Sequence, residues 1–367
     1  MTSIYLIRHA EAEGNLYRIA QGQDNSNLTD RGWRQVRALE KRFADIHIDT
    51  VYASDLYRTC ATASAVYKAK GLPLHRMREL REICVGRWEQ RTWGDIYRED
   101  PVQMDYFNRQ PDKWHVEGAE TPGQVLERVL KAVRAVAAEN EGKTVAVFSH
   151  GYAIRLILAY LQGYPLERLG ETPTGDNTAV SLLEAEGDTL RVVFRDDNSH
   201  LKTPEFLAGE KVRKRAIALE PGLWFQPLQL PEQAGFLREL LSPEWGAAFD
   251  PDRLLADAAR RETLVGYLRE EPVGVVQLGP EPGWISLLCI RADCRKRGFG
   301  AQLIGQAVQH TRPLGGGQLI AALAEDHAAH SFFSDYGFRP AGTLEDGRTR
   351  LEKDIRFVPE FLGETDT

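Results

Sequence analysis

Two histidines in the first half of the chain each stand directly after a run of apolar residues. His9 follows Arg8 and the apolar residues 4–7, and His150 follows the run over residues 144–149. A short apolar run that stops at polar residues is typical of a buried strand with functional groups at its end. Imidazole is a nucleophile and a proton carrier near neutral pH, so both histidines are candidates for catalysis. Taken alone, a histidine at a strand end more often has a structural role.

Two arginines accompany these histidines. Arg8 precedes His9, and Arg58 lies in the first turn of a helix predicted over residues 57–70, just past a strand predicted over residues 49–53. Guanidinium groups and helix N-termini both favour an anion. A surface ion pair is the alternative reading of Arg58 by itself. Combined with two imidazoles, the arginines predict a site that holds a phosphate group.

Two carboxylates are further candidates. Glu82 follows a third predicted strand and lies close in sequence to Trp88 and Trp93. Tryptophans that exclude water would raise the pKa of Glu82 and suit it to donating a proton, whereas the nearby arginines favour a solvated surface role. Glu120 precedes a predicted long helix, so it could contact a substrate or simply stabilise the helix N-terminus.

The elements that carry these residues alternate between strands and helices over about the first 200 residues. This order predicts an α/β fold, with a mostly parallel sheet covered by helices on both faces. Ligands of such sheets bind at the carboxyl ends of the strands. The residues that lie at or just after predicted strand ends are Arg8, His9, Arg58, Glu82 and His150. Their shared position is the evidence for a site.

Length and composition narrow the possibilities further. A chain of 367 residues is expected to form two domains. The net charge of −7 argues against a nucleic-acid partner. The four cysteines lack metal-binding spacing and suit a reducing compartment. No apolar run is long enough to span a bilayer, and no basic-then-apolar signal opens the chain. We therefore expect a cytoplasmic protein with no membrane partner and no metal site.

Residues 1 to about 203 resemble the histidine phosphatase (phosphoglycerate mutase-like) superfamily. The matching motifs are Leu6-Ile7-Arg8-His9-Ala10-Glu11, Leu28-Thr29 with Gly32 and Gln35, Ser54-Asp55-Leu56 with Arg58-Thr59, Leu80-Arg81-Glu82, Gly118-Ala119-Glu120 and Ser149-His150-Gly151. The resemblance implies that His9 is transiently phosphorylated, without a cofactor, and that Glu82 protonates the departing alcohol. It also implies a set of phosphate- and substrate-binding residues: Arg8, Arg58, His150, Asn15, Gln21, Glu120 and Gly151.

The resemblance leaves the reaction open between hydrolysis and phosphoglycerate mutase-type phosphotransfer. The segment from Glu82 to Glu120 is short, and no Tyr-Tyr-Gly run occurs in it. Residues 86–93 look like those of small broad-specificity or ribazole-type phosphatases. Hydrolysis of a small phosphorylated metabolite is therefore the expected reaction, with a phosphate-binding protein that lacks turnover as a further alternative.

The composition shifts near residue 210, so we predict domains over residues 1–210 and 211–367. A charged stretch at 209–215 reads as a solvated linker rather than a nucleic-acid patch. Further on, a predicted strand over 284–290 leads through a basic, glycine-containing loop into a helix. Glycines and helix N–H groups in this order can cradle a diphosphate, although the loop lacks the GK[ST] ending of a Walker motif.

Residues 221 to about 357 resemble the GNAT acetyltransferases, an α/β family with a mixed sheet. The resemblance rests on Arg295, Gly298 and Gly300 and on the stretch from Ala328 to Phe338. It implies an acetyl-CoA site in which Ile290 presents its backbone to the pantetheine arm. The loop implied to bind the diphosphate comprises Arg295, Lys296, Arg297, Gly298, Phe299, Gly300 and Ala301.

The chain departs from the GNAT pattern where the leaving thiolate would be protonated. Phe333 stands in place of the tyrosine found in many of these enzymes, and Asp326 in place of an asparagine. Tyr336 and Glu325 are weaker candidates for proton transfer. The expected activity is acetyl transfer to a small-molecule or peptide amine, and a catalytically silent CoA-binding module is the alternative.

Overall fold

The computed structural model describes residues 1–210, 222–245, 251–258 and 260–362. Its N-terminal strands are β1 (Thr2–Arg8), β2 (Thr50–Ser54), β3 (Leu74–Met77), β4 (Thr144–Ser149), β5 (Val180–Glu186) and β6 (Thr189–Asp197). They form one sheet in the order β3-β2-β4-β1-β5-β6. The first four strands in this order are parallel, and β5 runs antiparallel to both β1 and β6. The predicted mostly parallel sheet is confirmed.

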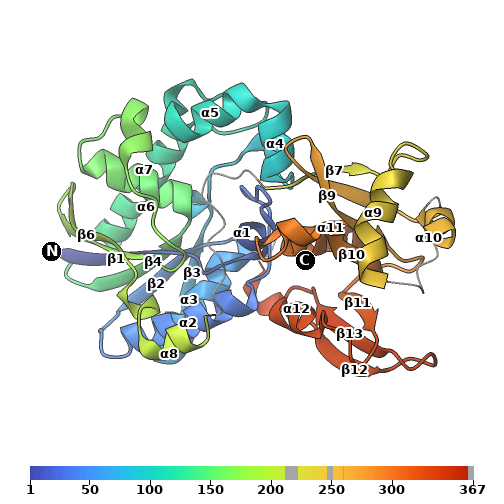
Figure 1. Cartoon of the computed structure of the whole chain (residues 1–367). Coiled ribbons are helices and arrows are strands. Elements are labelled where there is room, and N and C mark those ends of the chain that lie inside the picture. The colour runs from blue at the N-terminus through green and yellow to red at the C-terminus, as the bar shows by residue number, and fades with distance from the viewer. Residues whose placement is uncertain (211–221, 246–250, 259, 363–367) are drawn as a thin grey trace.

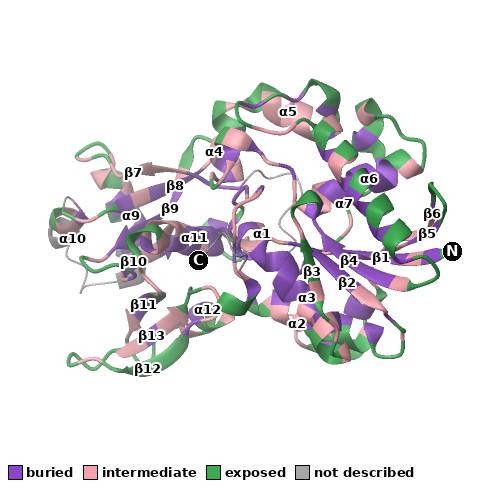
Figure 2. Cartoon of the chain, turned by 180° about the vertical axis from the view of Figure 1, so that it is seen from behind, coloured by how far each residue is buried: buried purple, intermediate pink, exposed green. Residues whose placement is uncertain are grey.

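Helices cover both faces of this sheet (Figure 1). They are α1 (Glu13–Tyr17), α2 (Asp30–Phe43), α3 (Tyr57–Lys70), α4 (Trp93–Glu99), α5 (Pro101–Arg109), α6 (Pro122–Glu139), α7 (Gly151–Leu161) and α8 (Pro204–Ala208). Alternate residues of β4 point to opposite faces: Val145 and Val147 pack with α6 and α7, whereas Ala146 and Phe148 pack with α2 and α3. The central strands are consequently buried (Figure 2).

The C-terminal strands are β7 (Trp224–Pro227), β8 (Thr263–Leu268), β9 (Glu271–Leu278), β10 (Ile285–Ile290), β11 (Gln318–Leu323), β12 (Arg339–Thr343) and β13 (Thr349–Asp354). The helices of the C-terminal half are α9 (Ala234–Trp245), α10 (Pro251–Ala258), α11 (Phe299–Thr311) and α12 (His330–Asp335). The strands form two sheets, β10-β9-β8-β7 and β11-β13-β12. In the described residues, the facing edges β10 and β11 are bridged in parallel at Trp284 and Ile320. Apart from this bridge, β10 and β11 belong to separate sheets.

The two halves of the chain meet at helices α1 and α11, which lie against each other (Figure 1). Tyr17 and Ile19, from the N-terminal half, are buried in the hydrophobic core of the C-terminal half. The predicted domain boundary at 210/211 lies at the edge of residues 211–221, which are outside the described part of the chain. The charged stretch predicted at 209–215 falls mostly within the same residues. The division into 1–210 and 211–367 therefore stays a proposal.

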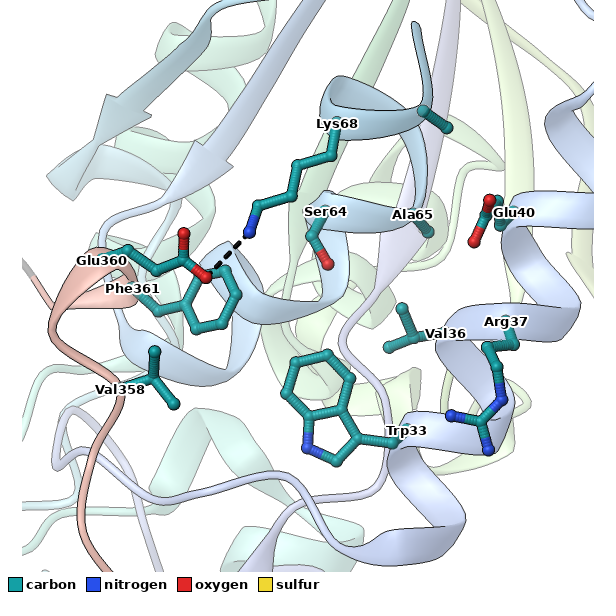
Figure 3. A pocket seen from close by; sticks show the side chains of 11 residues that line it. Trp33, Val36, Arg37, Glu40, Ser64, Ala65, Lys68, Val358, Glu360 and Phe361 are labelled. Atoms are coloured by element: carbon teal, nitrogen blue, oxygen red, sulfur yellow. Dashed lines mark hydrogen bonds and ion pairs between the residues drawn. The ribbon is translucent and has the colours of Figure 1, made fainter. Parts of the chain in front are cut away.

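Residues 355–362 form a tail that returns to the N-terminal half. The ring of Phe357 lies 5.1 Å from that of Tyr57, and Phe361 lies 6.0 Å from Trp33. The tail, α2 and α3 line a hollow of about 590 Å³ (Figure 3). None of the candidate site residues lines this hollow. In the described part of the chain, no helix combines the length and apolar character needed to cross a membrane.

Candidate active site

The rings of His9 and His150 lie next to each other at the carboxyl edge of the N-terminal sheet. β1 and β4 pair in parallel with Arg8 opposite Ser149, so the residues that follow reach the same rim. The ring centroids are 5.3 Å apart, and both histidines are buried. The structure thus brings together two side chains that are 141 positions apart in sequence, counted from 9 to 150.

His9 is held as a neutral imidazole whose Nε2 has no hydrogen-bond partner among the described residues. Its Nδ1 lies 2.7 Å from the carbonyl oxygen of Ala10. Because a carbonyl only accepts, Nδ1 carries the hydrogen and Nε2 carries the lone pair. Burial, followed by the charges of Arg58 and Arg8, holds the pKa of His9 well below its usual value. Nε2 is therefore an unprotonated nucleophile at neutral pH.

His150 is fixed through one ring nitrogen, and the other has no hydrogen-bond partner among the described residues. Its Nε2 lies 2.9 Å from Ser54 Oγ, while Nδ1 is buried without a partner among the described residues. Burial, followed by Arg58 and His9, lowers the pKa of His150. Ser54 is missing from the predicted site. Its place as the last residue of β2 is the sequence signal that could have identified it.

Arg8 and Arg58 each present an unsatisfied N–H group at this rim. Arg8 donates through Nη1 to the carbonyl of Gly175. Arg58 donates to the carbonyls of Asp24 and Gly22, both at 2.7 Å. Both arginines keep a buried Nε with no partner in the described structure. Burial lowers both pKa values, that of Arg58 to about 10, so both groups remain cationic at neutral pH. Two such N–H groups favour a bound anion.

Glu82 reaches the rim from the loop after β3. Its oxygens accept the backbone N–H groups of Tyr152 and Ala153 in the first turn of α7, both at 3.0 Å. The N–H of Ile83 adds a third bond at 3.1 Å. Glu82 therefore sits at the N-terminus of the helix that follows His150. The indole of Trp88, expected near this carboxylate, packs among other aromatic rings: Trp93, Phe107 and Trp114.

Asn15 and Gln21 have different surroundings. The Asn15 Oδ1 atom accepts from Asn177 Nδ2 at 3.3 Å, and the same amide donates to the carbonyl of His9 at 3.0 Å. The amide of Gln21 donates to Ser26 within its own loop. Asn177 is a second residue missing from the predicted site. It precedes β5, and an antiparallel neighbour of β1 begins at the rim where β1 ends.

Glu120 is bound by Arg128, whose Nε and Nη2 atoms lie 2.7 and 2.8 Å from its oxygens. The N–H of Cys84 adds a bond at 2.9 Å. Burial raises the pKa of Glu120, but these hydrogen bonds outweigh it and leave the pKa below its ordinary value. Arg128 also donates to the carbonyls of Glu82 and Arg81, at 2.8 and 2.7 Å. Through Arg128, Glu120 fixes the loop that carries Glu82.

The basic loop of the C-terminal half leads from β10 into α11. Gly298 caps this helix at φ 88°, and a Cβ added there would meet nothing within 4 Å. Its backbone and the first N–H groups of α11 fit a diphosphate. Arg295 Nε donates to the carbonyl of Ile290 at 3.0 Å. A Cβ on Gly300 would lie 2.6 Å from the ring of Phe332, so packing alone requires this glycine.

In the rest of this loop, Lys296 is exposed and Arg297 is half-buried, whereas the residue at the position of the missing tyrosine is internal. The guanidinium of Arg297 lies 4.9 Å from the ring centre of Phe299. Phe299 and Ala301 are buried, so they can offer only backbone to a ligand. Phe333 is also buried, with its ring centre 4.9 Å from that of Phe338. Phe333 therefore serves the hydrophobic core.

The model of the histidine phosphatase superfamily (branch 1) matches residues 4–198, more than half of the 367 residues. The chain belongs to the histidine phosphatase superfamily. The model of the acetyltransferase (GNAT) family matches residues 234–338, so this histidine phosphatase also carries a GNAT domain. Both resemblances predicted from sequence motifs are confirmed.

Named relatives of this histidine phosphatase include phosphatases and mutases. Phosphoserine phosphatase 1 of Hydrogenobacter thermophilus is 28% identical over 186 residues, which cover 51% of this chain and 88% of the relative. The probable phosphoglycerate mutase GpmB of Erwinia tasmaniensis is 30% identical over 165 residues, covering 45% and 77%. The solved structure of Bacillus stearothermophilus YhfR is 32% identical, with a TM-score of 0.53, over 55% of this chain and 100% of that one.

The position of Gly151 predicts a steric sensitivity of the candidate site. A Cβ at this position would lie 3.0 Å from both Cζ and Nε of Arg8. We expect Gly151→Ala to displace the guanidinium and to lower kcat/KM for a phosphomonoester about tenfold or more. Gly123, near the start of α6, is the matched control, because an added Cβ meets no atom nearer than 3.9 Å. Equal activity of the two variants in steady-state assays would contradict the prediction.

The neutral histidines predict the pH dependence of activity and stability. Since the pKa values of His9 and His150 lie well below 6.5, the acid limb of kcat/KM should fall below pH 6.5. In the unfolded chain, both histidines bind protons below about pH 6.5, whereas the native protein does not. The free energy of unfolding should therefore decrease as the pH falls through this value. Rate profiles and urea titrations between pH 5 and 8 would check this, and an acid limb centred at 6.5 would contradict it.

Proposed function

We propose that the N-terminal domain hydrolyses phosphomonoesters through a phosphohistidine at His9. The observation that carries the proposal is the unprotonated Nε2 of His9, beside His150 and two arginines that each keep an unpartnered Nε. A tetrahedral phosphoryl group satisfies these N–H groups. In His150, by contrast, Nε2 is bonded to Ser54.

The reaction has two balanced steps. His9 Nε2 attacks phosphorus, the N–P bond forms, and the P–O bond to the alcohol breaks in line. Arg8, Arg58 and His150 stabilise charge on the equatorial oxygens. Glu82 gives its proton to the leaving alkoxide and then, as a carboxylate, takes a proton from the water that attacks phospho-His9. The second attack releases phosphate and restores His9. The arginines supply the positive charge, so the proposed steps need no metal.

The reaction product distinguishes hydrolysis from mutase chemistry. We infer hydrolysis from the short segment between Glu82 and Glu120, which leaves little chain to shield a phosphoenzyme from water. The purified protein should release phosphate from p-nitrophenyl phosphate, and phosphoserine is a natural second substrate to test because a relative bears its name. Interconversion of phosphoglycerates without release of phosphate from any monoester would overturn this proposal in favour of a mutase.

For the GNAT domain, we propose binding of acetyl-CoA and transfer of its acetyl group to an amine. The residues proposed to hold it are the loop 295–301 and the edges of β10 and β11 beyond the Trp284–Ile320 bridge. Acetyl-CoA would supply an activated thioester for attack by the amine. Because Phe333 is buried and lacks a hydroxyl, a silent CoA-binding domain is the second candidate.

Calorimetry with acetyl-CoA distinguishes a domain that binds this ligand from one that no longer can. Gly298→Ala should weaken binding at least about tenfold, because φ 88° strains an alanine in the cradle itself. Gly315→Ala is the matched control, with φ 78° at the other end of α11 and no ligand contact proposed. Binding heat in the wild type without acetylation of any amine would favour the silent module. No heat at all would remove the acetyl-CoA proposal.

A further inference from the structure

Arg58 is held in place by the short turn over residues 21–24. Its two terminal nitrogens donate to the carbonyls of Gly22 and Asp24, and its buried Nε has no hydrogen-bond partner among the described residues. The side chain is 1% exposed, so the carbonyls fix the direction of the guanidinium. Whatever fixes this turn therefore fixes the phosphate-binding N–H groups of Arg58.

The carboxylate of Glu89 lies directly against this turn. Its oxygens accept the backbone N–H groups of Gln23, at 3.1 Å, and of Asp24, at 3.4 Å. A Cβ added to Gly22 would lie 1.9 Å from Glu89 Oε1, so the turn rests on the carboxylate with no intervening atom. Gly22 also has φ 45°, a conformation that favours glycine.

Glu89 is itself anchored from two sides. The N–H of Val85 donates to Oε1 at 3.0 Å. The next residue, Gln90, donates its N–H to the carbonyl of Ala20 at 2.8 Å, and Ala20 donates back to Arg91 at 2.8 Å. These bonds join the segment that carries Glu89 to the segment that enters the turn. The carboxylate is thus a fixed support rather than a mobile surface group.

We propose that Glu89 is a positioning residue for the phosphatase reaction: it holds the 21–24 turn, whose carbonyls orient Arg58 toward the phosphoryl group. This inference rests on the proposed phosphatase function. Burial, with Asp24 adding to it, raises the pKa of Glu89 to about 7. Keeping a carboxyl group at such a position is unfavourable by itself, which agrees with a specific role in the contact.

A double-mutant cycle between Glu89→Gln and Arg58→Ala tests the proposal, with kcat and KM for p-nitrophenyl phosphate as readouts. Glu89→Gln retains the shape but replaces an accepting oxygen with an NH₂ group that faces backbone N–H donors. We expect it to lower kcat/KM about tenfold with Arg58 present and less than twofold in Arg58→Ala. A merely structural residue would lower activity by the same factor in both backgrounds, and that result would overturn the proposal.

Two controls make the outcome unambiguous. Glu99→Gln is the same change in the neighbouring helix α4, where the carboxylate pairs with Arg91, and it should leave kcat/KM unchanged. Thermal melting reports folding, and Glu89→Asp replaces Glu89→Gln under the same criterion if the latter does not fold. A wild type that hydrolyses no monoester would refute the phosphatase proposal itself. An active wild type that is sensitive to Arg58→Ala but not to Glu89→Gln would refute only the role of Glu89.

Discussion

Replacement of His9 by alanine is expected to lower kcat/KM for p-nitrophenyl phosphate by at least about 10⁴-fold. The variant loses His9 Nε2, which is unprotonated, whereas His150 Nε2 is bonded to Ser54. The wild type, quenched rapidly with base after mixing with substrate, should carry phosphate on His9, and the variant should carry none. Steady-state rates and mass spectrometry of the quenched protein measure both effects.

His47→Ala serves as the matched control for this experiment. The His47 ring is 81% exposed, and among the described residues it bonds only to Asp49 on the surface, so its loss should leave kcat/KM within about twofold. An unchanged thermal melting transition of His9→Ala would show that the chain is folded. If His9→Ala retained a tenth of the wild-type activity, the phosphohistidine mechanism would be wrong. If the wild type bound phosphate without any turnover, the domain would be a phosphate-binding protein.

The positions of the motifs at predicted strand ends indicated most of the N-terminal site, because the carboxyl ends of parallel strands lie at one edge of a sheet. Arg8, His9 and His150 were predictable for this reason, since β1 and β4 are neighbours and each ends in a polar pair. Arg58 followed from its place at the start of α3. The same reasoning extends to Ser54, which ends β2, although a serine at that position has no distinctive charge to reveal it.

Contacts that depend on loop conformation were not predictable. Glu120 has its partner, Arg128, within the helix that it precedes, and nothing in the spacing indicates that Arg128 also binds the carbonyl of Glu82. The sequence does not reveal the contacts of Glu89 either, because its partners are backbone N–H groups, including those of a distant turn. Polar residues whose function is to hold backbone lack the periodicity and charge pairing from which sequence reasoning proceeds.

The helix α1 illustrates a second limit. Its five residues are too few to show helical periodicity or to be stable alone. Their structure depends on packing against α11, which lies nearly three hundred residues later in the chain. This contact joins the loop that follows His9 to the helix that begins at the proposed diphosphate cradle.

Tyr17 is therefore expected to control the stability of both halves. It is 1% exposed, and its Cβ lies so near α11 that a Cβ on Gly305 would be 2.6 Å away. Tyr17→Ala should lower the free energy of unfolding by about 3 kcal/mol, because it leaves a cavity in a core shared by the two domains. Urea titrations followed by phosphatase activity and by acetyl-CoA binding should shift together to lower midpoints.

Tyr17→Phe is the matched control, and it separates packing from hydrogen bonding. The Tyr17 hydroxyl is buried and has no hydrogen-bond partner among the described residues. Its removal should leave the protein equally stable or up to about 1 kcal/mol more stable. Equal destabilisation by alanine and phenylalanine would show that the hydroxyl, rather than the ring, holds the junction. If Tyr17→Ala shifted only the phosphatase transition, the two domains would unfold independently and α1 would not couple them.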